Sequence, residues 1–370
     1  MVYPSGPADY ALRLDSDVDD FGISGVRFRD YPTSVIEVES GGTPDYLNIS
    51  KCIFDNVCAS GEGAVLDLLN ASHVDVQHNQ ITLDAGAANT DAIRMGVQLG
   101  GTLTSRSVSL LGVNNNQIQM GLGSNLNAVK VVAEGPGDDA HVNEVNIGDN
   151  TVSGSSGAAV HIRDGNSATN SSIRNVSIRN NTFSYDVAPT YTPNGDSAGV
   201  VVLENVSAQN GDDQNDVSDN VIRVSQSSPL ATGIYVSGSE TDNLIVQSND
   251  VVGSNTLSSL AGVLIHPSNP PANADILIRG NNLTGWRRAV LTGNLSSNVA
   301  LTLQDNNLQV ISDGAKVENH PSGPADVKSI CDYWGVDGVP DPDDEVIGTL
   351  KIVTYKLNGL DLLPAPGFQG

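Results

Sequence analysis

The stretch NVSIRNNTF, from Asn175 to Phe183, decides the fold of this chain. Its apolar residues Val176 and Ile178 alternate with polar ones, which is typical of a β-strand with one buried face. Asn181 then stands two residues before Phe183. Written as apolar-x-apolar-x-x-Asn-x-apolar, the same phrase returns along most of the chain, and this indicates a repeat architecture.

The repeat contains two interleaved phrases, 25 to 39 residues apart from one copy of the first phrase to the next. The first has its asparagine at Asn79, Asn116, Asn150, Asn181, Asn220, Asn249, Asn281 and Asn306, and two earlier copies have Val26 and Cys52 there. The second, small-apolar-x-apolar, begins at Ala11, Ala92, Ala128, Ala159, Gly199, Gly233, Gly262 and Ala289. Each repeat therefore holds at least two short strands, separated by Gly, Asn, Ser and Asp, and helix signals are nearly absent.

Strands this short bury an apolar face only when they are stacked coil upon coil. The sequence therefore predicts an all-β fold, a single-stranded right-handed parallel β-helix of about ten or more coils. We assign residues 1–320 to the β-helix and residues 321–370 to a C-terminal cap with the last strands. The cap prediction depends on a break in the repeat after Pro321 and on the late strand-like run TLKIVTYKL.

The recurring asparagine has two predicted structural roles. It stands where one strand bends into the next, and asparagine tolerates the left-handed backbone region better than most residues. Asparagine side chains stacked one strand apart can also hydrogen-bond along the axis, as in asparagine ladders. We therefore interpret the asparagine as structural.

The composition narrows the function classes. The 370 residues carry a formal net charge of -25, with 34 Asp against 9 Glu and 12 Arg against 6 Lys. A surface with many short acids and few lysines resembles that of halophilic proteins, and an ordinary acidic extracellular protein is the alternative. Phosphate binding needs basic stripes, so nucleic acid is not expected as a partner. No apolar run is long enough for membrane insertion, and no signal peptide is visible.

Metal and disulfide signals are weak. The three cysteines, Cys52, Cys58 and Cys331, form no zinc-type spacing and no disulfide scaffold, although the first two could bridge. Two acidic runs, DSDVDD and DPDDE, could hold Ca²⁺ because calcium prefers oxygen ligands. Their candidate ligands are Asp15, Asp17, Asp341 and Asp343. Neither run fits a twelve-residue calcium loop, and a solvated acidic surface is the alternative. No cofactor follows with certainty.

A family resemblance appears in CDYWGVDGVPDPDD, from Cys331 to Asp344. Tyr333, Trp334, Gly335 and Pro340 are similar to the NWWG-x-x-x-GP signature that ends many pectate-lyase-like and NosD-like right-handed parallel β-helix proteins, although Val339 interrupts the match. With the acidic composition, the resemblance suggests a protein of a halophilic archaeon or its virus. The superfamily includes polysaccharide lyases, glycoside hydrolases, virus tailspikes and adhesins, so fold alone does not choose a function.

The third residue of the second phrase should point outward, because its neighbours point into the core. Rung by rung this outward column reads Arg13, Glu37, Asp67, Arg94, Lys130 and His161. Arg163 lies two residues beyond His161, on the same face. Three basic residues on consecutive rungs predict a site for an acidic glycan, or a lyase in which Arg or Lys removes a proton next to a carboxylate. Alternatively, Arg94 pairs with Asp67 and the others are ordinary surface residues.

Further along, the outward column becomes apolar at Val201, Tyr235, Leu264 and Leu291. Such a stripe is usually covered, either by the chain's own loop or by a neighbouring subunit, which would favour a homotrimer. Tyr191 in a proline-bearing loop, Tyr235 and Trp286 complete the set of candidate glycan-binding residues, since aromatic rings stack on sugars. Trp286 could equally pack against the coil wall.

Two function classes follow. The first is a non-catalytic β-helix at a cell surface or on a virion, like a tailspike, fibre or adhesin, which contacts glycans or neighbouring subunits. The second is a polysaccharide lyase or glycoside hydrolase that acts on an acidic polysaccharide. No catalytic residue can be assigned, because no cluster of outward acids on consecutive rungs is evident in the sequence. An extracellular location is expected for both classes.

Overall fold

The computed structural model describes most of the chain. The described residues are 10–15, 18–39, 42–57, 63–83, 90–100, 103–121, 127–135, 139–154, 157–165, 171–186, 189, 198–207, 214–226, 228, 231–238, 243–256, 259–266, 275–293, 299–311, 316–319, 326–330, 332–334, 346–347, 351–352 and 355–356. By its contacts the chain divides into two units, Met1–Ser177 and Ile178–Gly370.

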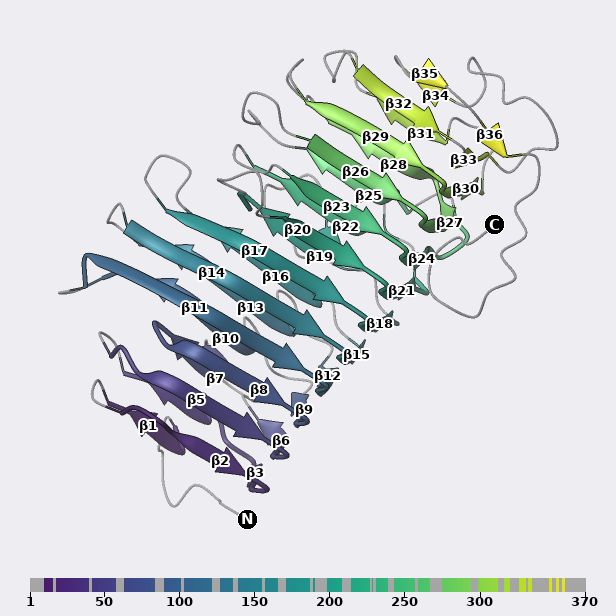
Figure 1. Ribbon diagram of the computed structural model, residues 1–370. Coiled ribbons are helices and arrows are strands. Elements are labelled where there is room, and N and C mark those ends of the chain that lie inside the picture. Colours follow the sequence, from purple (N-terminus) through teal and green to yellow (C-terminus); the bar gives the residue numbers. More distant parts are fainter. Residues whose placement is uncertain are drawn as a thin grey trace. The chain divides into compact units, whose positions relative to one another are not determined.

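Every third strand belongs to the same sheet, so each unit contains strands of three sheets (Figure 1). In the first unit, sheet 1 contains β1 (Leu12–Leu14), β4 (Ile36–Val38), β7 (Gly63–Leu69), β10 (Thr90–Gln98), β13 (Val129–Glu134) and β16 (Val160–Asp164). Sheet 2 contains β2 (Gly22–Ser24), β5 (Asp45–Ser50), β8 (Ser72–Gln77), β11 (Ser105–Asn114), β14 (Asp139–Gly148) and β17 (Ser172–Arg179). Sheet 3 contains β3 (Arg27–Arg29), β6 (Ile53–Val57), β9 (Gln80–Leu83), β12 (Gln117–Met120) and β15 (Thr151–Gly154).

The second unit repeats this order. Its sheet 3 strands are β18 (Thr182–Tyr185), β21 (Val221–Val224), β24 (Asp250–Val252), β27 (Asn282–Trp286), β30 (Asn307–Val310), β33 (Asp332–Tyr333) and β36 (Tyr355–Lys356). Its sheet 1 strands are β19 (Ala198–Glu204), β22 (Ala231–Ser237), β25 (Ala261–His266), β28 (Arg288–Thr292), β31 (Val317–Asn319) and β34 (Val346–Ile347). Its sheet 2 strands are β20 (Asn215–Ser218), β23 (Leu244–Gln247), β26 (Asp275–Arg279), β29 (Ala300–Gln304), β32 (Asp326–Ile330) and β35 (Lys351–Ile352).

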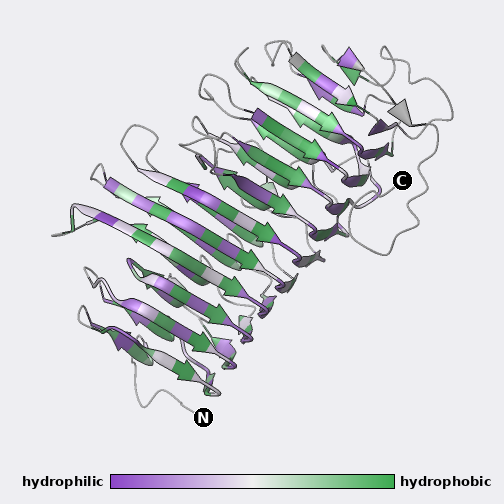
Figure 2. Ribbon diagram, viewed as in Figure 1, coloured by the Kyte–Doolittle hydropathy of each residue, from purple (hydrophilic) through white to green (hydrophobic). Residues whose placement is uncertain are grey.

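The predicted fold class is confirmed: the chain is an all-β, right-handed parallel β-helix whose described residues supply twelve strands to each sheet. This fold results from the period-2 pattern. Hydrophobic and hydrophilic residues alternate along many strands (Figure 2), so that one side of the strand faces the core. Leu47, Val74, Leu111 and Val145 show the result, because they are directly opposite one another from β5 to β14 and all are buried. Each rung thus covers the apolar side chains of the rung below.

The predicted asparagine ladder is confirmed at the bend between sheet 2 and sheet 3. In the first unit the Asn79 backbone N–H and Nδ2 both donate to Asn116 Oδ1, at 2.9 and 3.0 Å, and Asn116 donates to Asn150 in the same way. Cys52 occupies the preceding position, where its backbone N–H donates to Asn79 Oδ1. The Cys52 thiol lies 3.3 Å from the Ser50 carbonyl oxygen. Burial raises the pKa of this thiol, so Cys52 is an uncharged end of the ladder.

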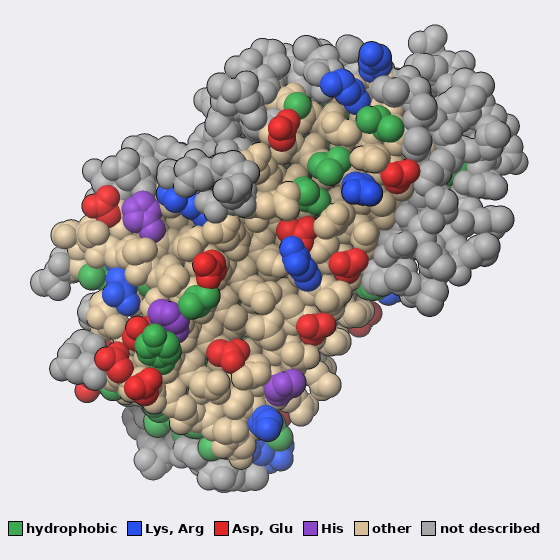
Figure 3. All heavy atoms as spheres, viewed as in Figure 1, with side chains coloured by type: hydrophobic (Ala, Val, Ile, Leu, Met, Phe, Trp, Pro, Cys, Tyr) green, Lys and Arg blue, Asp and Glu red, His purple; other side chains and the backbone are tan. Residues whose placement is uncertain are grey.

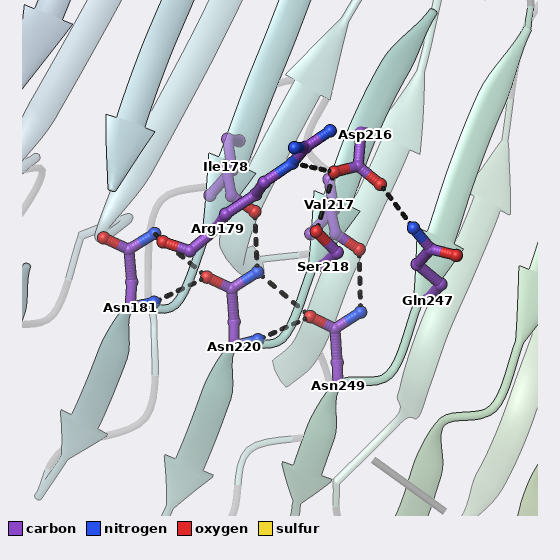
Figure 4. A network of polar contacts seen from close by, with 9 residues as sticks. All are labelled: Ile178, Arg179, Asn181, Asp216, Val217, Ser218, Asn220, Gln247 and Asn249. Carbon is purple, nitrogen blue, oxygen red and sulfur yellow. Dashed lines mark hydrogen bonds and ion pairs between the residues drawn. The ribbon is translucent and has the colours of Figure 1, made fainter. Parts of the chain in front are cut away.

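In the second unit the ladder links Asn181, Asn220, Asn249, Asn281 and Asn306. Figure 4 shows its first three members. Its last described member is Asp332, whose Oδ1 accepts hydrogen bonds from the Asn306 backbone N–H and Nδ2 at 2.7 and 2.9 Å. Each central Nδ2 also donates to a backbone carbonyl one coil back, as Asn220 does to Ile178 at 2.8 Å. These side chains therefore satisfy buried backbone groups that the bend would otherwise leave without partners.

The sequence predicted that the ladder asparagine itself stands in the left-handed backbone region, and this prediction is wrong by one residue. The residue with left-handed φ is the one immediately before it, such as Asn115 at 57°, Asp219 at 56° or Ser248 at 54°. The ladder asparagine itself does not adopt a positive φ. The two tasks are divided because a left-handed residue points its side chain to solvent, whereas the ladder amide must point into the coil.

Ser248 provides a test of this division. The left-handed region costs an ordinary L-residue about 1–2 kcal/mol, and asparagine pays less of that cost than serine. We therefore expect Ser248→Asn to raise the free energy of unfolding by roughly 0.5–1 kcal/mol. Ser248→Val should lower it, because a β-branched side chain resists this conformation. Urea unfolding of both variants checks the prediction, and equal stabilities would contradict it.

At the C-terminal end, the described strands β32 to β36 keep the order of the three sheets. Most of residues 321–370 lies outside the described residues. The predicted cap and its boundary therefore stay a prediction.

Candidate functional site

The predicted outward column on sheet 1 of the first unit is confirmed in register. Pairing between neighbouring strands places the six residues directly opposite one another, in the order Arg13, Glu37, Asp67, Arg94, Lys130 and His161. The register therefore includes Glu37 and Asp67, whose places were the hardest to assign from sequence. The spacing of the column follows the strand spacing of about 4.8 Å.

Arg94 is held by Asp67 on the preceding rung. Its Nε donates to Asp67 Oδ1 at 3.1 Å, and Nη2 donates to Asp67 Oδ2. Burial lowers the pKa of Arg94, but the hydrogen bonds and charge of Asp67 outweigh it, so the pKa is raised. A two-point pair of this kind is strong and fixes the guanidinium in place. The alternative interpretation of Arg94, as the partner of Asp67, is what the structure shows.

A second carboxyl group lies behind the basic residues. Asp91, at the start of β10, is buried and accepts a hydrogen bond of 2.8 Å from Asn127 Nδ2. Burial raises the pKa of Asp91, while the positive charges of Lys130, Arg94 and His161 act in the opposite direction. Asp67 therefore offsets the charge of Arg94, whereas burial favours the uncharged form of Asp91.

His161 and Arg163 are less available than their sequence positions suggested. His161 has an exposed fraction of 0%, so its predicted place on the open surface is wrong. Arg163 is opposite Val132 on β13 and is partly buried. The period-2 pattern separates the two faces of a strand, but it does not say whether the outer face is itself covered.

Of the aromatic candidates, Trp286 is completely buried, and its Nε1 donates to the Val251 carbonyl at 3.0 Å. It packs against the coil wall, as the alternative proposed. Tyr235 is also buried. Tyr191 lies outside the described residues.

The structure corrects the register that the sequence predicted for the apolar stripe of the second unit. Val202, and not Val201, is opposite Tyr235, because β19 and β22 pair one residue away from the alignment of the two sequence phrases. Leu264 and Leu291 follow Tyr235 as predicted. Val201, Tyr235 and Leu264 are all buried within the single chain, so they offer no open apolar surface for a second subunit. The predicted homo-oligomer stays a prediction.

Among the described residues, no group of three or more His, Cys, Asp or Glu could hold a metal ion. Asp15 is exposed, and Asp17, Asp341 and Asp343 lie outside the described residues. The calcium suggestion therefore stays a prediction.

A hollow of about 280 Å³ lies beside the column, over β4, β7 and β10. Its polar lining consists of Glu37, Glu39, Asp67, Asn70, Arg94 and Gln98. The end of the hollow is fixed by Asn70, which has a left-handed φ of 63° and exchanges hydrogen bonds of 3.0 and 3.2 Å with the Gln98 backbone. The outer carboxylate, Glu39, accepts a hydrogen bond of 2.9 Å from Arg13 Nη2.

From the sequence, Glu37 and Asp67 were placed on consecutive rungs of the outward column, but they were not interpreted as an acid pair. In the structure they are outward carboxyl groups directly opposite each other. The signal was present in the runs VIEV and VLDL, which share one alternation.

No family model, curated protein or solved structure matches the chain. Within the described residues there is also no helix that is long and apolar enough to cross a membrane. The family resemblance suggested by residues 331–344 therefore has support only at the level of the β-helix fold.

Proposed function

We propose that the chain is a non-catalytic β-helix protein of a cell surface or virion that binds an uncharged glycan in the sheet 1 hollow. The observation that carries this proposal is the lining, in which Glu37, Asp67 and Arg94 stand on three successive rungs. Carboxylates, amides and a guanidinium all form hydrogen bonds with hydroxyl groups. Their stacking at about 4.8 Å is comparable to the length of one sugar unit.

The charge of the hollow favours an uncharged sugar over an acidic one. Glu37, Glu39 and Asp67 contribute three carboxylates, against two guanidinium groups, that of Arg94 in the lining and that of Arg13, which is bound to Glu39. Arg94 is already bound by Asp67, so a glycan carboxylate would meet mainly negative charge. An acidic polysaccharide, and with it a lyase mechanism, is therefore a weaker proposal than it was from sequence alone.

A glycoside hydrolase is the second candidate, and the Glu37 and Asp67 pair favours it. Hydrolysis needs two carboxyl groups about 5–5.5 Å apart for retention, or about 6.5–9.5 Å apart for inversion. Side chains opposite each other on adjacent strands have Cβ atoms about 4.5–5.5 Å apart, which allows either arrangement. Asp67, which is bound to Arg94, would be the nucleophile or base, and Glu37 the acid.

Affinity gel electrophoresis against neutral polysaccharides and a polyuronate tests the proposal. We expect a neutral polysaccharide to retard the chain and the polyuronate to leave it unaffected. Glu37→Gln should weaken binding about tenfold, which corresponds to about 1.4 kcal/mol. Asp139→Asn, the removal of an exposed carboxylate outside the hollow, is the matched control and should bind normally.

Reducing ends are measured in the same incubations. Binding without product supports the non-catalytic function. If the wild type releases reducing ends and Asp67→Asn does not, the hydrolase replaces the non-catalytic function. If Glu37→Gln does not weaken binding, the hollow is not the binding site.

The setting is part of the same proposal. We infer a pectate-lyase-like or NosD-like protein of a halophilic archaeon or its virus, located outside the cell. The net charge of -25 and the excess of Asp over Glu support this origin, because a dense short-acid surface holds water in high salt. The signature at Tyr333 and Trp334 supports the superfamily. Neighbouring subunits remain candidate partners, on the same grounds of a surface location.

A further inference from the structure

A column of left-handed residues crosses sheet 2 in the first unit. Asp20, Tyr46, His73, Leu110 and Glu144 all have φ between 50° and 59°. The strand pairings on either side place Tyr46 beside His73, and Leu110 beside Glu144, on neighbouring strands of this sheet. The left-handed residue interrupts the alternation at one place on each of these rungs, without a shift of register between the strands.

Two residues of this column, Tyr46 and Leu110, are not of the types that the left-handed backbone prefers. Glycine, asparagine, aspartate and histidine are enriched at positive φ, whereas Tyr46 and Leu110 adopt it at a cost. Elsewhere in the same unit the left-handed positions include Asn56, Asn70 and Asn115. Side chains retained against the backbone preference are candidates for a binding role, since strain of this kind gathers at ligand sites.

The column presents an apolar surface that is unusual for this chain. Among the described residues, the exposed large hydrophobic side chains are Tyr46 at 54%, Leu110 at 46% and Ile347. The rings of Tyr46 and His73 stack with centroids 4.4 Å apart and an angle of 20° between their planes. His73 Nδ1 lies 2.7 Å from Asp45 Oδ1, and this contact fixes the imidazole. Figure 3 shows hydrophobic, histidine and acidic side chains gathered on the face where β5, β8 and β11 lie.

We propose that Tyr46, His73 and Leu110 form a ridge that binds a neutral saccharide chain laid along the stacking direction, as a second contact surface for glycan. The ligand class rests on the proposed function, whereas the site is separate from the hollow because it lies on sheet 2. Tyr46 and Leu110 are two rungs apart, about 10 Å, which is about the length of a disaccharide. Apolar and aromatic side chains pack against the C–H face of a sugar ring.

The flanking charges and the size of the ridge favour this ligand over others. Asp45 and Glu144 are carboxylates that can accept hydrogen bonds from hydroxyl groups and would repel an anionic glycan. A stable protein partner usually covers about 800 Å² of each surface. Three side chains interspersed with acidic residues offer too small an area for a protein partner, but they suffice for a sugar chain.

The variant Tyr46→Asn separates binding from folding. Asparagine suits the left-handed backbone, so the melting temperature should stay the same or rise, while the affinity for a neutral polysaccharide should fall about tenfold. Ile347→Asn removes another exposed apolar side chain, in the second unit, and should leave the affinity unchanged. Affinity electrophoresis and thermal unfolding of both variants give the two readouts.

The possible outcomes distinguish the ridge from the hollow as the binding site. Normal binding by Tyr46→Asn, with weakened binding by Glu37→Gln, would overturn the ridge and leave the proposed function standing. The reverse result would support the ridge and remove the hollow. A lower melting temperature with unchanged affinity would make the Tyr46 ring purely structural. If no neutral polysaccharide retards the wild-type chain, both proposals fail.

Discussion

Asn220→Ala should lower the free energy of unfolding by roughly 4 kcal/mol. The Asn220 side chain is completely buried and takes part in four hydrogen bonds. Its Oδ1 accepts from the Asn181 backbone N–H and Nδ2, at 3.0 and 2.9 Å. Its Nδ2 donates to the Ile178 carbonyl at 2.8 Å and to Asn249 Oδ1 at 3.0 Å. Alanine removes the side-chain acceptor of the Asn181 backbone N–H and the donor to the Ile178 carbonyl, and each such loss costs about 1–3 kcal/mol. The other two groups keep a hydrogen bond, because Asn249 Oδ1 still accepts from the backbone N–H of residue 220 and Asn181 Nδ2 still donates to the Arg179 carbonyl.

Asn146→Ala is the matched control for this experiment. Asn146 is an exposed asparagine of β14, so the same chemical change there should alter stability by no more than about 0.5 kcal/mol. Urea unfolding followed by circular dichroism compares the two variants with the wild type. A loss for Asn220→Ala as small as that for Asn146→Ala would show that the ladder does not stabilise the coil.

Most of the fold could be predicted from the sequence because the two patterns that determine it recur from repeat to repeat. Alternation fixes which side of a strand faces the core, and the recurrence of Asn at one place in the phrase fixes the bend. Stacking equivalent phrases then gives the register, which is how Arg94 and Lys130 were correctly placed on neighbouring rungs. The same reasoning failed by one residue at Val201, where the two phrases are aligned but the strands pair with a different offset.

The candidate sites were harder to predict, for two physical reasons. Burial of an outer face depends on segments distant in sequence, so the complete burial of His161 has no local signal. The ridge at Tyr46 and Leu110 depends on a left-handed residue within the strand, which breaks the alternation without any turn-forming residue to mark it. The adjacent leucines in SLLGV are the trace of that break, and a search for broken alternation on successive rungs could have found it.

The second large effect is expected at the other end of the ladder, where Asp332 occupies an asparagine position. Its Oδ1 accepts two hydrogen bonds from Asn306, as an asparagine would, and its Oδ2 accepts one of 2.6 Å from the Ser329 hydroxyl. Burial raises the pKa of Asp332 from 3.8 to about 6, against the opposing effect of these hydrogen bonds. The folded chain therefore holds the proton of this carboxyl more firmly than the unfolded chain does.

The sign of the pH dependence follows from the direction of this pKa change. Below about pH 4 the carboxyl is protonated in both states, and ionisation costs the fold nothing. Between pH 4 and pH 6 the unfolded chain ionises first, so the wild type loses stability as the pH rises. The side chain of Asp332→Asn does not ionise, and its amide oxygen can accept the two hydrogen bonds from Asn306 in the same place. Its stability advantage over the wild type should therefore grow by about 2 kcal/mol from pH 4 to pH 7.5.

Urea unfolding of the wild type and Asp332→Asn at several pH values between 4 and 7.5 measures this difference. Using the difference between the two proteins cancels the titration of the other carboxylates, which they share. Asp275→Asn makes the same chemical change at an exposed carboxylate of β26 and is the matched control for the substitution. A pH-independent difference for Asp332→Asn would mean that the buried carboxyl ionises as easily in the fold as in water. The ladder would then end on a charge stabilised by its three donors, and not on an acid that the coil prefers to keep protonated.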